Sequence, residues 1–340
     1  MVKKTVLVTG CAGFIGMHIA LKLIKMNYRV VGIDNLNSYY DIKIKRQRLK
    51  ELSVFKNFTF FKKDLRNFKV LESVYRKFKF KKIVHLAAQA GVRYSIKNPK
   101  DYLENNIDVF LNILEFSKKN KINHLLYSSS SSVYGNNKLY PFSENHSVDH
   151  PISIYATTKK TNELMAHTYS KLFNLATTGI RFFTVYGPYG RPDMALFKFT
   201  KNIIENKKID VFNNGNMFRD FTYIDDAIDA LYKIIKKDPK IEKNFNKKKP
   251  SPEISDCKYR IFNIGNNKSI KLSKFINLIE KCLKKKAKIN YMPMQMGDIK
   301  STVASNKILN NWIKQKKPTP HHLGIKRFVD WYKQYFKIDI

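Results

Sequence analysis

The stretch Thr9-Gly10-Cys11-Ala12-Gly13-Phe14-Ile15-Gly16 decides the fold of this chain. It follows the short apolar run Thr5-Val6-Leu7-Val8 and opens a series of residues with the spacing of one helical face. That series is Gly16, Ile19, Ala20, Leu23 and Ile24. The glycines therefore lie between a strand and a helix, where they allow a tight turn and close approach of a ligand. Because the start of a helix offers unpaired N–H groups, the pattern predicts a site for a dinucleotide pyrophosphate.

An acidic residue follows the glycines at a distance typical of dinucleotide-binding units. A second apolar run, residues 28–33, ends at Asp34. A carboxylate about 20 residues beyond the last glycine can accept a hydrogen bond from a ribose 2′-OH, and it repels a 2′-phosphate. We therefore expect NAD rather than NADP. The alternative interpretation of Asp34 is an ordinary acid at the end of a strand.

Length and cysteine content limit the class of protein. A chain of 340 residues is long enough for about two domains. Cys11, Cys257 and Cys282 show no CxxC or metal-ligand spacing, so we expect no metal site and a reducing, cytoplasmic location. The chain contains no run of about 18 apolar residues, so we expect no transmembrane helix and no membrane partner.

The net charge of +37 is extreme and allows two interpretations. One is a surface that binds nucleic acid or anionic membranes. The other is a solvated lysine surface, which is favoured because the lysines are scattered and the dense run at 236–249 resembles an exposed helix and loop. We therefore expect no nucleic-acid partner.

Further strands alternate with helical patterns along the first half of the chain. They are expected at residues 58–61, 82–86, 124–127 and 177–183. This alternation predicts an α/β fold with a doubly wound parallel sheet. Beyond Tyr186 the pattern is broken by prolines and glycines, so we expect a first domain at 1–186 and a second, smaller domain mainly at 187–340. Segments near 220–236 and 258–265 are expected to return to the first domain.

Two helix details also follow from the pattern. Asp101, after Pro99, is expected to begin a helix, and Asp225 is expected to cap a later one. The buried stripe of the earlier helix is expected to be Leu103, Ile107, Phe110, Leu111 and Leu114.

A second group of residues carries reactive side chains. Serines 128–132 follow a strand, and Tyr155 and Lys159 share one helical face behind the expected cap Ser153. A serine, a phenol and an ammonium could therefore converge at one nicotinamide. Tyrosine has a pKa of about 10, so a base near neutral pH needs a depression of roughly three units, which a nearby ammonium and oxidised NAD can supply. The alternative is that Lys159 is an ordinary solvated lysine.

These motifs, with Val133-Tyr134-Gly135 after the serines, resemble the extended short-chain dehydrogenase/reductase family, over nearly the whole chain. More specific stretches are similar to UDP-glucuronate 4-epimerases. They are residues 34–41, 88–95, 187–194, 219–226 and 297–298. The resemblance implies a Rossmann domain, a C-terminal substrate-binding domain, bound NAD, a UDP-sugar substrate and often a homodimer. It implies inversion of C4 of UDP-glucuronate to give UDP-galacturonate through a 4-keto intermediate.

The resemblance also implies a role for each matching residue. The expected contacts of the pyrophosphate are Gly10, Gly13, Phe14, Ile15 and Gly16. The expected contacts of the adenosine are Asp34, Asn35, Asp64 and Leu65. The rest of the cofactor is expected to be lined by Leu86, Ala87, Ala88, Gln89, Asn106 and Ser128. In catalysis, Ser130 is expected to bind the substrate hydroxyl, Tyr155 to act as the base and Lys159 to bind the nicotinamide ribose. Arg219 is expected to meet the diphosphate and Asp298 the uridine ribose.

A uronic acid oxidised at C4 is a β-keto acid, so its carboxylate must be held still to prevent loss of CO₂. The expected hydroxyl donors are Ser130, Ser131, Ser132 and Thr184. Arg93 and Arg191 are expected to supply positive charge, although Arg191 could instead meet the diphosphate, and Thr184 and Arg93 could be merely structural.

Three residues depart from the family pattern: Val109 replaces a usual glycine, Tyr189 a usual tryptophan and Met296 a usual proline. Two other functions stay open at this point. One is a UDP-glucose/UDP-galactose 4-epimerase with the same chemistry, and the other is a basic NAD-binding scaffold for anionic polymers.

Overall fold

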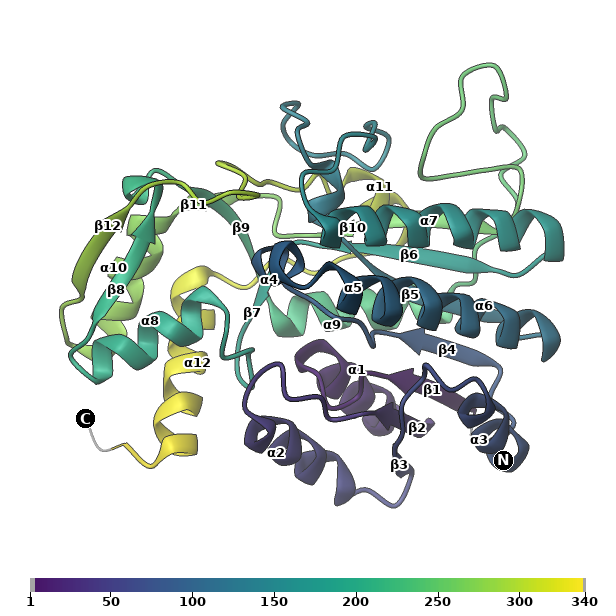
Figure 1. Cartoon of the computed structure of the whole chain (residues 1–340), viewed down its shortest axis with the longest axis horizontal. Coiled ribbons are helices and arrows are strands. Elements are labelled where there is room, and N and C mark those ends of the chain that lie inside the picture. The colour runs from purple at the N-terminus through teal and green to yellow at the C-terminus, as the bar shows by residue number, and fades with distance from the viewer. Residues whose placement is uncertain (1–3, 339–340) are drawn as a thin grey trace.

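The computed structural model describes residues 4–338, and its largest element is a seven-stranded parallel sheet (Figure 1). The strand order is β10-β6-β5-β4-β1-β2-β3. These strands are β1 (Thr5–Thr9), β2 (Arg29–Asp34), β3 (Phe58–Lys62), β4 (Lys82–His85), β5 (His124–Ser130), β6 (Thr177–Phe182) and β10 (Tyr259–Ile264). The expected doubly wound Rossmann sheet is confirmed, because the strand order reverses direction across β1.

Helices cover both faces of this sheet. They are α1 (Phe14–Lys25), α2 (Ile42–Ser53), α3 (Lys69–Phe78), α4 (Val92–Lys97), α5 (Pro99–Tyr102), α6 (Val109–Lys119), α7 (Ile154–Phe173) and α9 (Ile224–Lys236). Successive side chains of a strand point to opposite faces. Accordingly, Val6 and Val8 of β1 share a core with α1 and α9, whereas Leu7 shares a core with α3 and α6.

The helix expected from Asp101 is interrupted. A π-helical segment, Leu103–Asp108, joins α5 to α6, and α5 already begins at Pro99. Because a π-helical turn holds more residues than an α-helical one, it changes which side chains face the core. The expected stripe is therefore partly wrong: Leu103 and Leu111 are 52% and 42% exposed, while Phe110 and Leu114 are buried.

The expected cap of α9 is also wrong. Tyr223 occupies the N-cap position without a side-chain hydrogen bond, and Asp225 lies in the first turn of the helix. An acid in that turn still interacts favourably with the positive end of the helix dipole.

The second domain is smaller and holds two short sheets, β11-β9-β7 and β12-β8. Its strands are β7 (Thr184–Tyr186), β8 (Lys208–Phe212), β9 (Phe218–Tyr223), β11 (Ser269–Lys271) and β12 (Lys288–Met292). Its helices are α8 (Ala195–Ile204), α10 (Leu272–Leu283) and α12 (His321–Phe336), whereas α11 (Lys307–Trp312) packs against β10 of the large sheet. The chain crosses back between the domains, because β10 completes the large sheet and α9 packs against α1. The boundary at residue 186 stays a prediction.

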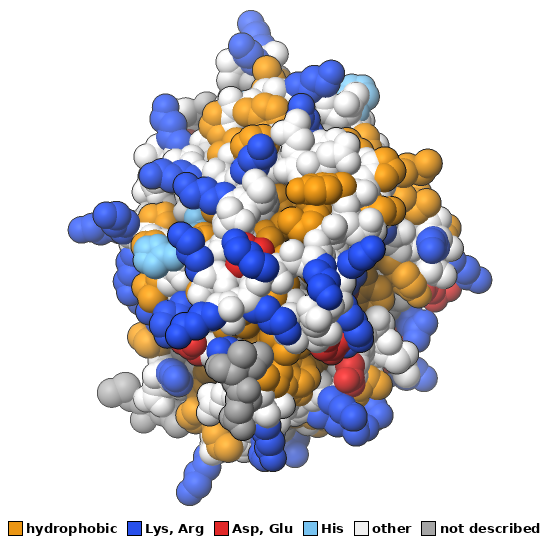
Figure 2. Space-filling model, turned by 90° about the vertical axis from the view of Figure 1, so that its left-hand side faces the viewer, with side chains coloured by type: hydrophobic (Ala, Val, Ile, Leu, Met, Phe, Trp, Pro, Cys, Tyr) orange, Lys and Arg blue, Asp and Glu red, His pale blue; other side chains and the backbone are white. Residues whose placement is uncertain are grey.

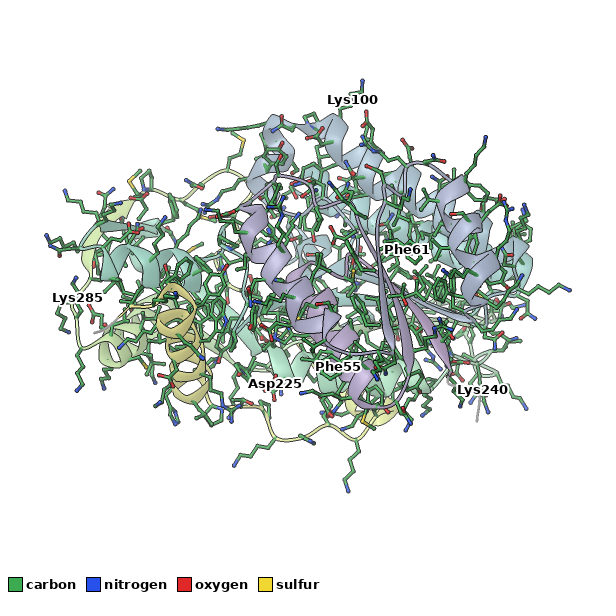
Figure 3. The ribbon with its side chains drawn as sticks, turned by 90° about the horizontal axis from the view of Figure 1, so that it is seen from below. Phe55, Phe61, Lys100, Asp225, Lys240 and Lys285 are labelled. Carbon is green, nitrogen blue, oxygen red and sulfur yellow. The ribbon has the colours of Figure 1, made fainter. Side chains whose placement is uncertain are left out.

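Basic residues are spread over the surface. Figure 2 shows lysine and arginine side chains scattered over one face, with apolar and neutral atoms between them. In Figure 3, Lys100, Lys240 and Lys285 lie at three separate edges of the molecule. This distribution matches the solvated lysine surface expected from the sequence. Within residues 4–338, no helix combines the length and the apolar character needed to cross a membrane.

Candidate active site

The glycine turn between β1 and α1 has no room for side chains. A Cβ atom at Gly16 would lie 2.0 Å from the carbonyl oxygen of Gly10, and one at Gly10 would lie 2.7 Å from the amide nitrogen of Ala87. Gly10 also has a φ of +69°, which L side chains rarely adopt. Gly13 caps α1 without a side-chain hydrogen bond, so the first N–H groups of the helix are available to a ligand. This cradle fits the pyrophosphate of NAD.

Asp34 is fixed at the end of β2 by two backbone groups. Its Oδ1 atom accepts a hydrogen bond of 2.8 Å from the Leu36 amide, and its Oδ2 atom accepts one of 3.1 Å from the Ala12 amide. Asn35 donates to Asp64 at 3.2 Å, and the Arg66 guanidinium holds the pKa of the Asp64 carboxyl below its usual range. Two carboxylates and an amide therefore lie at the place expected for the adenosine. Such groups can form hydrogen bonds with a free ribose 2′-OH.

We expect cofactor-stripped protein to bind NADH more tightly than NADPH by about 10–100-fold. The reason is that a charge-assisted hydrogen bond to the 2′-OH contributes about 1.5–3 kcal/mol and is lost with a 2′-phosphate. Fluorescence titration with both nucleotides measures the ratio, and Asp34→Asn should reduce it. Tighter binding of NADPH would contradict the role of Asp34.

One cavity of about 1020 Å³ extends from the glycine turn into the second domain. All the site residues expected from the sequence line it, except Asn106. The Oδ1 atom of Asn106 accepts from the Gln89 amide at 2.8 Å, and its Nδ2 atom donates to the Gln89 carbonyl at 3.0 Å and to Thr158 at 3.0 Å. Asn106 therefore lies behind Gln89 and holds it in place, and its expected role at the cofactor stays a prediction.

Several residues that line the cavity were missed. Tyr39, Tyr40 and Lys45 do so, as does Val109, one of the departures from the family pattern. A signal was present for the two tyrosines, because they belong to the stretch 34–41 that is similar to the epimerases. Nothing in the local pattern marked Lys45, whose ammonium donates to the Asn37 carbonyl at 2.7 Å.

The reactive side chains lie where β5 ends and α7 begins. Ser153 caps α7 as expected, since its hydroxyl accepts a hydrogen bond of 3.1 Å from the Ala156 amide. Lys159 donates to the carbonyl of Ser128 at 2.9 Å and to its hydroxyl at 3.2 Å. Lys159 is only 3% exposed, which excludes the interpretation as an ordinary solvated lysine. Tyr155 lies one helical turn before Lys159 and borders the same cavity.

The protein alone does not depress the pKa of the phenol. Burial raises the pKa of Tyr155, while a hydrogen bond from Ser130 and the charge of Arg191 lower it by less. Burial also lowers the pKa of Lys159 to about 7. The expectation that the ammonium activates the phenol is therefore not met in the protein itself. Oxidised NAD is the other positive charge that was expected to lower the pKa of the Tyr155 phenol.

The cavity arginines fall into two groups. Arg191 forms two hydrogen bonds with Asp193, at 3.0 and 2.5 Å, and its charge reaches Tyr155. Arg93 instead pairs with Asp298 at 2.9 Å and lies over the ring of Phe212.

Arg219 lies with Arg93 and Asp298, because the charges of both residues act on its guanidinium. Burial nevertheless has the largest effect on Arg219 and lowers its pKa. Arg93 thus lies with the residues expected to bind the nucleotide. Its expected place beside the sugar carboxylate stays a prediction, although one nitrogen of its guanidinium already pairs with Asp298.

Comparison with known proteins gives consistent matches over the whole chain. The model of the NAD dependent epimerase/dehydratase family matches residues 6–265. "Protein CapI" of Staphylococcus aureus is 51% identical, over 98% of this chain and 99% of that protein. A "Probable UDP-glucuronate 4-epimerase" of Rhizobium meliloti is 40% identical, over 97% of both chains. The crystal structure of a UDP-glucuronic acid 4-epimerase from Bacillus cereus, in complex with UDP-glucuronic acid and NAD, superposes with a TM-score of 0.86. It is 32% identical, over 97% of this chain and 99% of that one.

Proposed function

We propose, from the premise that the chain belongs to the NAD dependent epimerase/dehydratase family, that it converts UDP-glucuronate to UDP-galacturonate by inversion at C4. The protein is an NAD-dependent nucleotide-sugar 4-epimerase, and the finer proposal concerns its sugar. One observation carries that step: four hydroxyl side chains line the cavity that also holds Tyr155 and Lys159. They are Ser130, Ser131, Ser132 and Thr184. The epimerases from Rhizobium meliloti and Bacillus cereus support the same sugar.

The residues of the site suggest how the reaction proceeds. Bound NAD supplies a reversible two-electron oxidant for the carbon that is inverted. Tyr155 removes the proton of the C4 hydroxyl and later returns it, while Ser130 orients that hydroxyl. Lys159, fixed by Ser128, is available to the ribose next to the nicotinamide. A positioned acid–base group contributes about 10²–10⁴-fold to such a reaction.

Short hydroxyl donors suit the carboxylate of the oxidised sugar. A 4-keto uronate loses CO₂ when its carboxylate turns perpendicular to the new carbonyl. Ser130 and Ser132 already form a local hydrogen-bonded pair, with the Ser130 Oγ atom 3.1 Å from both the amide and the hydroxyl of Ser132. A second anchor from Thr184, on another strand, keeps the bond that joins the carboxylate to the ring from standing perpendicular to the plane of the new carbonyl.

We expect the protein to convert UDP-glucuronate without added NAD, and to prefer it over UDP-glucose by about 10–100-fold in kcat/KM. This ratio follows from the 1.5–3 kcal/mol of a charge-assisted hydrogen bond to the carboxylate. NMR of both substrates, followed over time, tests the proposal. Equal or faster turnover of UDP-glucose would favour the neutral-sugar 4-epimerase instead. Absence of turnover on both would favour the scaffold.

We expect Thr184→Val to slow epimerisation and to release a UDP-pentose. The substitution keeps the shape of the side chain but removes one donor to the carboxylate. Thr59→Val, on the edge strand β3 and outside the cavity, is the matched control and should leave product ratios unchanged. Product analysis by NMR decides, and clean epimerisation by the Thr184 variant would remove this residue from the carboxylate site.

The proposal extends to a homodimer in a cytoplasmic location. Large apolar side chains are exposed on the π-helical segment, α6 and α7, which pack side by side. They are Leu103, Leu111, Leu164 and Leu172. An exposed apolar face of this kind is typical of a protein interface.

A further inference from the structure

Arg48 is an unusual residue because its charge is completely buried. It lies on α2, which in Figure 1 occupies the side of the first domain nearest α12. Its side chain is 0% exposed, whereas Arg46 on the same helix is exposed. No carboxylate forms an ion pair with Arg48 among residues 4–338. A buried charge without such a partner is costly unless hydrogen bonds replace its hydration.

Arg48 donates five hydrogen bonds in place of that hydration, and the acceptors lie in three segments of the chain. The Nη1 atom donates to the Ala12 carbonyl at 2.9 Å and to the Tyr40 hydroxyl at 2.7 Å. The Nε and Nη2 atoms donate to the Tyr189 carbonyl at 3.1 and 2.8 Å. Nη2 also donates to the Gly190 carbonyl at 3.2 Å. The guanidinium therefore uses its planar set of donors fully.

The acceptors belong to the two halves of the active site. Ala12 lies inside the glycine turn that fits the cofactor, and Gly190 directly precedes Arg191, which borders the sugar end of the cavity. Tyr189 has a φ of +59°, a conformation that a bulky residue keeps only when its surroundings enforce it. Its carbonyl receives two of the bonds from Arg48, so Arg48 is part of that enforcement.

An apolar side chain of similar volume would fill the same space without the cost of burying a charge. A volume-filling role therefore does not explain the guanidinium. What the guanidinium adds is a fixed geometry between the turn and the loop, since its planar fork orients several carbonyls at once.

We propose that Arg48 is a positioning residue that locks the loop 187–191 to the glycine turn, so that binding of NAD and binding of the nucleotide strengthen one another. The proposal rests on the proposed function, because it takes the diphosphate of UDP, the alternative partner expected for Arg191, as the group on the loop side. By linkage, any effect of UDP on the affinity for NADH has an equal counterpart in the effect of NADH on UDP.

The test compares Arg48→Lys with Arg46→Lys, a matched change on the exposed face of the same helix. Lysine keeps the positive charge but cannot present a planar fork to several carbonyls. The dissociation constant of NADH is measured in stripped full-length protein, with and without saturating UDP. We expect UDP to tighten NADH at least fivefold in the wild type and in Arg46→Lys, and less than twofold in Arg48→Lys. A merely structural role would weaken both ligands or lower Tm without changing this ratio.

The other outcomes are also decisive. The proposal is overturned if Arg48→Lys keeps the wild-type ratio, if Arg46→Lys loses it, or if the wild type binds both ligands without coupling. If Arg48→Lys does not fold, Tyr40→Phe, which removes one acceptor of the guanidinium, must reduce the ratio. Failure of the wild type to bind UDP in calorimetry contradicts the proposed function instead. In that case the coupling proposal fails together with the proposed function, whereas UDP binding without coupling overturns the coupling proposal alone.

Discussion

Tyr155→Phe should reduce epimerisation of UDP-glucuronate at least about 100-fold while the fold and the bound NAD are retained. The phenol oxygen is needed for proton transfer, whereas the ring only fills the space beside Tyr102, whose ring centroid lies 6.0 Å away. Initial rates by NMR and the absorbance of retained cofactor measure both parts. Tyr291→Phe, at a position 60% exposed, is the control and should behave as the wild type. A rate above roughly a tenth of the wild-type value would remove Tyr155 from the role of base.

The pH dependence gives a second readout of the same role. The hydrogen bond from Ser130 lowers the pKa of Tyr155, so its removal in Ser130→Ala raises that pKa further. A base must be deprotonated to act, and a higher pKa leaves less of the active form at neutral pH. The acid limb of the kcat/KM profile should therefore move to higher pH. A limb that stays in place would mean that another group sets it.

The second large effect is expected from Gly16→Ala. The new Cβ atom would lie 2.0 Å from the Gly10 carbonyl oxygen, so the start of α1 or the turn must move. Overpacking of this kind typically costs 1–3 kcal/mol, and the movement also displaces the N–H groups that fit the pyrophosphate. We expect the affinity for NADH to fall at least about 100-fold and Tm to fall by several degrees.

Titration of stripped protein and thermal unfolding measure these two changes. Lys25→Ala, at an exposed position of the same helix, controls for changes in helix propensity. Unchanged affinity for NADH in the Gly16 variant would show that the turn tolerates a side chain, and would contradict the packing described here.

Much of the fold was predictable because it is encoded in local patterns. The glycine turn, Asp34 and the strands of the large sheet depend on residues close together in the chain. The π-helical segment 103–108 was not predictable, since no residue in the sequence marks where the extra residue of such a turn is inserted. Leu103, where the expected stripe was wrong, lies in that segment.

The site was predictable where a motif carries the chemistry and unpredictable where distant segments meet. Tyr155 and Lys159 were found because they share a helical face. The contacts of Arg48 with Tyr189 and of Arg93 with Asp298 join residues that are 141 and 205 positions apart. No local pattern in the sequence indicates such pairs. The burial that raises the pKa of Tyr155 is also a property of the folded chain and could not be predicted locally.

The position of β10 has a consequence for how the chain can be cut and for how it is made. Strand β6 hydrogen-bonds to β5 on one side and to β10 on the other, and β10 is Tyr259–Ile264. A fragment that stops at residue 186 would leave β6, whose residues are all buried in the whole chain, as an unpaired edge strand, which invites aggregation. During synthesis, the same edge stays open until residue 264 has left the ribosome. The first domain is therefore completed only after the part of the second domain that holds α8, β8 and β9 has been translated.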